Sequence, residues 1–373
     1  MLNKIVSLIF ILVLSLTVSM ALAAGDDFSF DDQPTSDLVT YPDWFKQNFL
    51  ELDEDLAEAN KNGKVLVTYF GQKRCAYCKQ LMETNFKLPD IVKYTRKHFD
   101  IVPLDIWSPE ELTTPKGQVM SERDYSISLD TNFTPSLVFY KPNGDIALRL
   151  RGYYPAYQFR AALEYVADEH YLVESFPDYL ARGDSTLRFE AEDMVEEPFF
   201  EKPPFHLDRS VIPGSRPLAV FFEQGNCHAC DILHTDPLRK QQIQRRMDQF
   251  FDSVQLDMWS DVPVVTPSGK ATTAKDWAKE LGLFYAPSIL FFDEKGKEIL
   301  RIDSVVQFVR LRNVLNYISS KAYLREKNYL VWSAKTRRLI DEMMPRMPNP
   351  LSQPMQPVAP TKPQYCLTTN CMN

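Results

Sequence analysis

Four cysteines of the chain form two Cys-x-x-Cys motifs, Cys75-Ala76-Tyr77-Cys78 and Cys227-His228-Ala229-Cys230. Two thiols at this spacing can close into a disulfide and open again by exchange with another sulfur, because a thiolate is a good nucleophile. A proline follows the first cysteine of each motif by 60 residues, in Thr134-Pro135-Ser136 and in Ala286-Pro287-Ser288. A dithiol with a proline at one fixed distance, found twice, favours disulfide exchange over a structural disulfide.

The two motifs belong to a long internal repeat. A shift of 152 positions carries the first motif onto the second. The same shift matches residues far from the cysteines, since Leu104, Asp105, Trp107 and Ser108 fall on Leu256, Asp257, Trp259 and Ser260. This period indicates duplicated domains, because solenoid units are only about 20–50 residues long. We predict a first domain over residues 43–182, an acidic, proline-bearing linker over 183–215, and a second domain over 216–343.

Strands and helices of one pattern are expected to hold each dithiol. In the first copy, apolar runs predict strands and apolar residues at helical spacing predict helices. The predicted strands are 65–70, 101–104, 136–140 and 146–150, and the predicted helices are 43–60, 75–81, 121–129 and 156–180. This order is typical of an α/β fold in which helices flank a central mixed sheet. The second copy repeats it, and its last helical stretch ends near Met343.

The expected helix start at each motif distinguishes its two thiols. The positive end of the helix dipole and the unpaired N–H groups stabilise a thiolate at the first cysteine. We therefore predict that Cys75 and Cys227 are the nucleophiles. Cys78 and Cys230, one helical turn later, then attack the mixed disulfide and release the substrate.

The charges beside the two motifs differ. Lys73, Arg74 and Lys79 surround the first dithiol, whereas Asn226 and Asp231 flank the second. Positive charge favours the thiolate and therefore the reduced form of the pair. We expect the two pairs to have different reduction potentials.

Each copy resembles a thioredoxin-fold domain, and specifically the secreted thioredoxins that accompany bacterial sulfur-oxidation systems. The residues that carry the resemblance are Trp44-Phe45, Leu52–Leu56, Ala59, Tyr69-Phe70, Cys75-x-Tyr77-Cys78, Leu104–Trp107 and Thr134–Phe139. The resemblance implies two thioredoxin-like domains in tandem that act as a thiol-disulfide oxidoreductase. We expect its substrates to be cysteine-containing exported proteins. No dissociable organic cofactor is expected, because the two dithiols carry the electrons, and a protein that works as a reductase would need a membrane electron donor.

The resemblance also implies a role for the residues around the distant prolines. Thr134 and Ala286 would precede cis peptide bonds to Pro135 and Pro287. Their backbone groups would then remain available to pair with a substrate strand.

Two departures from the family pattern bear on activity. Similar proteins often have proline directly after the first cysteine, where this chain has Ala76 and His228. The acidic residue that many thioredoxins bury behind the dithiol has no counterpart on strands 65–70 and 218–222. These departures argue against fast reductase activity of the cytosolic thioredoxin type.

The first 24 residues have the layout of a secretory signal peptide. Lys4 precedes an apolar run over residues 5–18, and Ala21-Leu22-Ala23 offers a small-residue cleavage site. The alternative is an uncleaved membrane anchor. Both interpretations predict a periplasmic or otherwise extracytoplasmic protein, where thiols can be oxidised.

The net charge of −8 is the opposite of the positive charge that nucleic-acid-binding proteins carry, so we expect no nucleic-acid partner.

The C-terminal residues 344–373 form a proline-rich tail that ends in Cys366-Leu-Thr-Thr-Asn-Cys371. The two tail cysteines can form a structural disulfide or a shuttle disulfide that visits a Cys-x-x-Cys site. A third alternative is Cu(I) binding, because thioether and thiolate are its preferred ligands. The methionines available for it are Met343, Met344, Met347, Met355 and Met372.

A metal at the second motif is also an alternative. His234 lies four residues after Cys230, on the same face of the expected helix, and with Cys227 could bind a soft or borderline metal. The simpler interpretation is a polar histidine on a partly exposed helix, and we assign no metal ligand. Two other functions compete with disulfide exchange. One is a copper- or metal-handling redox carrier that uses the Met/Cys tail and the dithiols. The other is a nonenzymatic assembly factor whose first helix and acidic linker dock a partner, and which would not need the motif cysteines.

Overall fold

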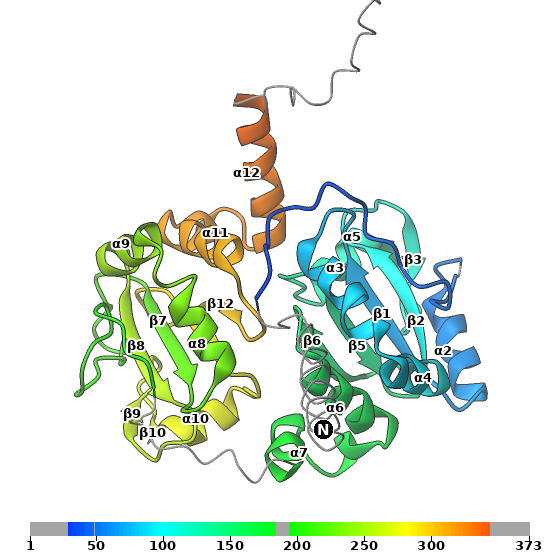
Figure 1. Ribbon diagram of the computed structural model, residues 1–373, viewed down its shortest axis with the longest axis horizontal. Helices are drawn as coiled ribbons and strands as arrows, with labels where there is room; N and C mark the ends of the chain where they lie inside the picture. The colour runs from blue at the N-terminus through cyan, green and yellow to red at the C-terminus, as the bar shows by residue number, and fades with distance from the viewer. Residues whose placement is uncertain (1–28, 48, 184–193, 344–373) are drawn as a thin grey trace, which may run out of the picture. The chain divides into compact units, whose positions relative to one another are not determined.

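The computed structural model describes residues 29–47, 49–183 and 194–343 (Figure 1). The expected signal peptide and the tail cysteines Cys366 and Cys371 lie outside these residues. Within the described ranges, no helix is both long and apolar enough to cross a bilayer. Two α/β domains follow one another along the chain, each with a mixed sheet flanked by helices, so the predicted fold class is confirmed.

The first domain is built on a four-stranded sheet in the order β2-β1-β5-β6. The central strand β1 is parallel to β2 and antiparallel to β5, which in turn pairs antiparallel with β6. The elements of this domain are α2 (Leu52–Lys61), β1 (Val65–Gly71), α3 (Ala76–Glu83), α4 (Pro89–His98), β2 (Phe99–Asp105), β3 (Glu111–Thr113), β4 (Val119–Ser121), α5 (Glu122–Ser128), β5 (Ser136–Tyr140), β6 (Ile146–Arg151), α6 (Ala156–Ala167) and α7 (Phe176–Gly183).

The second domain repeats this topology in the order β8-β7-β11-β12, again with one parallel pair at the edge. Its elements are β7 (Leu218–Glu223), α8 (His228–Thr235), α9 (Gln241–Phe250), β8 (Asp252–Asp257), β9 (Pro263–Val265), β10 (Ala271–Thr273), α10 (Ala274–Glu280), β11 (Ser288–Phe292), β12 (Glu298–Ile302), α11 (Phe308–Ser319) and α12 (Tyr329–Met343). Residues 194–217 contain no helix that corresponds to α2. Phe205 and Leu207, in the predicted linker, join the core on that face of the sheet instead.

Each sheet has an apolar core on both faces because successive strand residues point to opposite sides. In β1, Val67 and Tyr69 pack with α3, α4 and α6, whereas Leu66 and Phe70 pack with α2 and α5. The strand is therefore buried along nearly its whole length. This two-sided burial fixes the end of β1, and with it the loop that carries the first dithiol into α3.

Two predicted helices differ from those in the structure. The helix predicted over 43–60 begins only at Leu52. Trp44 and Phe45 lie in a turn before it, where Phe45 packs against Tyr69 and Phe86. The helix predicted over 156–180 is broken into α6 and α7, because Glu169 takes a left-handed backbone conformation (φ 57°). Helix α4 was not predicted, since its apolar positions are few.

Candidate active sites

The first dithiol lies where β1 passes into α3. Cys75 is the N-cap residue of α3 and is joined to Cys78 by a disulfide. The backbone N–H of Cys78 donates a hydrogen bond to Sγ of Cys75 at 3.0 Å. An N–H group aimed at this sulfur stabilises negative charge on it when the disulfide is opened.

The second dithiol repeats this geometry at the start of α8. Cys227 is the N-cap residue, it forms a disulfide with Cys230, and the N–H of Cys230 donates to its Sγ at 3.1 Å. The two predicted nucleophiles therefore occupy equivalent positions at helix N-termini. Their assignment as nucleophiles stays a prediction.

The prolines that follow each motif lie beside the sulfur atoms. The peptide bonds Thr134–Pro135 and Ala286–Pro287 are both cis, as the resemblance implies. The carbonyl oxygen of Thr134 lies 3.7 Å from Sγ of Cys75, and that of Ala286 lies 3.6 Å from Sγ of Cys227. The structure thus brings each dithiol together with its distant proline loop.

A glutamine and a tryptophan support each dithiol loop, and sequence reasoning missed the glutamine. The indole N–H of Trp107 donates to Oε1 of Gln72 at 3.0 Å, and Gln72 Nε2 donates to the hydroxyl of Thr134 at 3.0 Å. In the second domain, the indole of Trp259 donates to Gln224 at 2.8 Å. The signal for both glutamines was their identical position in the repeat.

The basic residues predicted to surround the first dithiol are exposed. Lys73 and Arg74 face solvent, and Lys79 lies 3.9 Å from the exposed carboxylate of Asp37 and 4.0 Å from that of Glu83. Exposed charges interact only weakly with their surroundings, because water and salt screen them. We therefore expect these three residues to stabilise the Cys75 thiolate less than their number suggests.

A buried arginine from the second domain contacts the first site. Nη2 of Arg310, on α11, donates a hydrogen bond to the carbonyl oxygen of Thr134 at 2.9 Å. Its guanidinium also lies 3.3 Å from the ring centroid of Tyr77, inside the Cys-x-x-Cys motif. The first dithiol belongs to a core cluster that includes Tyr285 and Val305 of the second domain.

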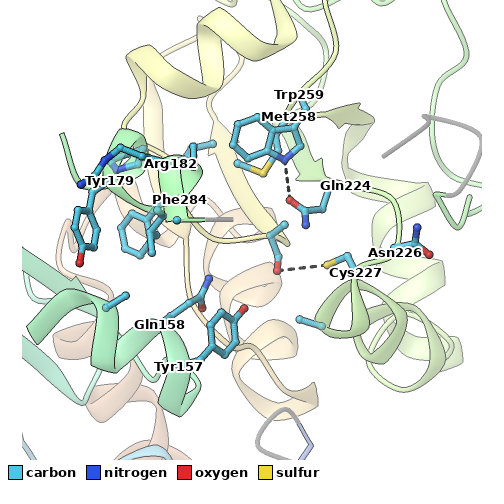
Figure 2. A pocket seen from close by; sticks show the side chains of 18 of the residues that line it. Tyr157, Gln158, Tyr179, Arg182, Gln224, Asn226, Cys227, Met258, Trp259 and Phe284 are labelled. Carbon is cyan, nitrogen blue, oxygen red and sulfur yellow. Dashed lines mark hydrogen bonds between the residues drawn. The ribbon is translucent and has the colours of Figure 1, made fainter. Parts of the chain in front are cut away.

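The second dithiol borders a cavity of about 710 Å³ (Figure 2). Cys227 forms part of its wall, and Tyr157 and Gln158, on α6 of the first domain, lie across the opening from the sulfur. The remaining apolar and aromatic wall includes Met258, Trp259, Phe284, Tyr179 and Leu180. A cavity of this size and lining is typical of a site that binds a ligand.

A buried ionic network lies on α8, one turn beyond Cys230. Nδ1 of His234 lies 2.9 Å from Glu197, and its Nε2 lies 2.9 Å from Glu223. Burial opposes the charged imidazole, but the hydrogen bonds and charges of Glu223 and Glu197 outweigh it and raise the pKa of His234. The interpretation of His234 as a partly exposed polar residue is therefore wrong, because its side chain is 2% exposed.

This network also bears on the metal alternative. Both ring nitrogens of His234 face carboxylates, so neither is turned towards the dithiol. Within the part of the chain that the structure describes, no group of three or more His, Cys, Asp and Glu side chains is arranged to hold a metal ion.

Glu223 is a buried acidic residue at the end of β7. It directly follows the segment 218–222, in which the sequence has no acidic residue.

Comparison with protein families finds the thioredoxin-like domain twice, at residues 52–167 and 208–319, which together make up more than half of the chain. No curated protein matches the chain. Among solved structures, it is similar to a thioredoxin-fold protein from Helicobacter pylori (24% identity over 33% of this chain and 80% of that chain, TM-score 0.30). It is also similar to a thioredoxin from Thermus thermophilus (22% identity over 36% and 91%, TM-score 0.27).

Proposed function

The chain belongs to the thioredoxin-like domain family, and we propose that it is an extracytoplasmic oxidoreductase that exchanges disulfides with cysteine-containing exported proteins. Two thioredoxin-like domains that each carry a Cys-x-x-Cys pair support the general class of thiol-disulfide oxidoreductase. The observation that supports active sites over structural disulfides is the repeated geometry. In both domains the first cysteine caps a helix and lies beside the carbonyl oxygen that precedes a cis proline.

The reaction starts from a reduced pair. The thiolate of Cys227 attacks one sulfur of a substrate disulfide, and the other substrate sulfur leaves as a thiolate that takes up a proton. Cys230 then loses its proton and attacks the sulfur of Cys227, which releases the second substrate thiol and closes the Cys227–Cys230 disulfide. Two electrons pass from the pair to the substrate, and the reverse sequence oxidises a substrate dithiol. Cys75 and Cys78 are proposed to act in the same way.

The cis-proline loops are proposed to align the substrate. Backbone groups of Thr134 and Ala286, next to Pro135 and Pro287, would pair with an extended substrate segment beside the nucleophile. Such a contact holds the reacting sulfurs in line, which lowers the entropic part of the barrier.

Export is proposed from the layout of residues 1–24 and from the resemblance to secreted thioredoxins of sulfur-oxidation systems. If the protein works as a reductase, a membrane dithiol donor would re-reduce the pairs. Cys366 and Cys371 would supply a structural or a shuttle disulfide.

Trapping of the mixed disulfide tests this function. The variant Cys78→Ser/Cys230→Ser keeps both proposed nucleophiles but lacks the thiols that resolve the intermediate. We expect it to accumulate a covalent adduct with a model peptide disulfide, assigned to Cys75 or Cys227 by mass spectrometry of its proteolytic peptides under non-reducing conditions. The matched variant Cys75→Ser/Cys227→Ser should form none at the motifs. Equal adducts in both variants, or none in either, would contradict the proposal.

A further inference from the structure

The repeat makes Arg310 and Gln158 equivalent residues. Gln158 lies on α6 and Arg310 lies 152 positions later on α11, and both helices begin and end at matching positions. Gln158 borders the cavity at Cys227, whereas Arg310 contacts the loop beside Cys75. Each helix therefore faces the dithiol of the other domain, but the two side chains differ in length, charge and contacts.

At the first dithiol this helix closes the site. The guanidinium of Arg310 donates a hydrogen bond to the carbonyl oxygen of Thr134, which belongs to the backbone proposed to bind a substrate strand. It also packs on the ring of Tyr77 at 3.3 Å and on that of Phe133 at 4.8 Å. Its side chain is thus enclosed between the proline loop and the motif, and the whole residue is only 8% exposed.

Further contacts hold α11 against the first motif. The backbone N–H groups of Val309 and Arg310 donate to the carboxylate of Asp32 at 2.9 and 2.8 Å. The hydroxyl of Tyr77 donates to the same carboxylate at 3.0 Å and accepts a hydrogen bond from the N–H of Gln307 at 2.8 Å. Arg310 is therefore part of a connected set of buried and half-buried contacts, and not a side chain resting on the surface.

At the second dithiol the equivalent positions leave a space. Ala229 stands where the first motif has Tyr77, and Gln158 stands where α11 has Arg310. Both replacements are smaller, and the cavity of about 710 Å³ borders both residues together with Cys227 (Figure 2). The two sites thus share one architecture. Arg310 and Tyr77 fill the space beside the first dithiol, whereas a cavity lies beside the second.

We propose that Arg310 caps the substrate position of the first dithiol, and that the cavity at Cys227 is where a cysteine-bearing polypeptide segment enters. This inference rests on the proposed function. The cavity wall favours a polypeptide because Tyr157, Phe284 and Trp259 offer aromatic surface to an apolar side chain next to the substrate cysteine. Substrates exchange first at Cys227/Cys230, and Cys75/Cys78 reacts with large partners only when Arg310 leaves Thr134.

Thiol labelling of the reduced full-length protein tests the cap. Each cysteine is labelled with N-ethylmaleimide and with a polyethylene-glycol-linked maleimide, and mass spectrometry reports the rate at each position. The ratio of the bulky-probe rate to the small-probe rate cancels differences in thiol pKa. We expect this ratio to be at least about tenfold lower at Cys75 than at Cys227, because the bulky probe must wait for local opening.

Substitutions taken from the repeat itself provide the comparison. Arg310→Gln should raise the ratio at Cys75 towards that of Cys227, whereas Arg312→Gln, on the same helix, should leave it unchanged. The reverse variant, Gln158→Arg/Ala229→Tyr, should lower the ratio at Cys227. If circular dichroism shows that Arg310→Gln does not fold, the Gln158→Arg/Ala229→Tyr variant still tests whether an arginine at this position blocks the bulky probe.

Equal ratios at Cys75 and Cys227 in the unmodified protein would overturn the cap, and so would a folded Arg310→Gln variant with an unchanged ratio. Failure of the proposed function is a separate result. In that case the accessibility difference would be observed, but neither pair would exchange with glutathione disulfide.

Discussion

The guanidinium of Arg310 donates to the carbonyl oxygen of Thr134 at 2.9 Å, and the same oxygen lies 3.7 Å from Sγ of Cys75. A buried positive charge therefore lies near the proposed nucleophile of the first domain, where it is screened far less than an exposed lysine. At the second dithiol the equivalent residue is the neutral Gln158. The expected difference between the two reduction potentials thus has a physical source that the local sequence does not contain.

Arg310→Gln should make the reduction potential of the Cys75/Cys78 pair more negative. Loss of the buried charge destabilises the thiolate and with it the reduced form, and about 30 mV corresponds to each ~1.4 kcal/mol for a two-electron couple. A glutathione titration of the variant measures the shift, with Arg312→Gln as the matched control. A shift in the opposite direction, or the same shift in both variants, would show that Arg310 does not act on the thiolate.

Tyr157→Ala should weaken binding of a peptide disulfide at the second site. Tyr157 lines the cavity and its side chain is largely exposed, so its loss removes contact surface without opening the core. We expect KM for a peptide disulfide with a flanking leucine to rise about fivefold, the effect of losing roughly 1 kcal/mol of aromatic contact, with little change in kcat. The assay uses the Cys75→Ser/Cys78→Ser background, in which only the second pair can react.

Two controls accompany this variant. Phe49→Ala removes an aromatic side chain that is 96% exposed and does not line the cavity, so KM should stay unchanged. With glutathione disulfide, which lacks an apolar flanking side chain, Tyr157→Ala should behave like the parent. A KM for the peptide that does not respond to Tyr157→Ala would remove the cavity from substrate recognition.

His234 should make the stability of the second domain depend on pH. Its pKa is raised in the folded protein, so its stabilising contribution is complete below the unfolded pKa of about 6.5 and is lost as pH rises through the folded value. The free energy of unfolding should therefore fall over that window, with a slope of at most about 1.4 kcal/mol per pH unit from this one proton. Denaturant titrations at several pH values measure it.

The variant His234→Gln should lose this part of the pH dependence and be less stable at low pH. Removing one partner of a buried ionic network costs roughly 3–5 kcal/mol, because Glu197 and Glu223 remain buried without it. His98→Gln serves as the control. Burial lowers the pKa of His98, so protonation of this residue at low pH disfavours the folded state, which is the opposite of the effect expected for His234. An unchanged pH profile in His234→Gln would refute the assignment.

The dithiol geometry was predictable because it is local. A cysteine that follows a buried strand and starts a helix becomes the N-cap of that helix, and the repeat showed twice which residues surround it. The cis-proline loop was predictable only through the resemblance, because 59 residues separate Cys75 from Thr134. The fold class followed from the same strand and helix pattern, found once in each copy.

Contacts between distant segments were not predictable. Arg310 and Thr134 are 176 residues apart, and their hydrogen bond depends on how α11 packs on the first domain. The burial of His234 likewise depends on Glu197, from the segment predicted as a linker. Helical spacing of aromatic residues was misleading before Leu52, because Phe49 faces solvent and Phe45 packs from a turn.

The most direct test of the central claim is a glutathione redox titration of the protein, in which differential alkylation and mass spectrometry report all six cysteines separately. We predict that Cys75/Cys78 and Cys227/Cys230 each titrate as a two-electron couple between roughly −120 and −270 mV, the range of known thioredoxin-fold oxidoreductases. Midpoints near −180 mV or above would indicate an oxidant or isomerase, and midpoints below about −250 mV a reductase. Pairs that stay oxidised below about −300 mV would be structural disulfides, and the proposed activity would be wrong.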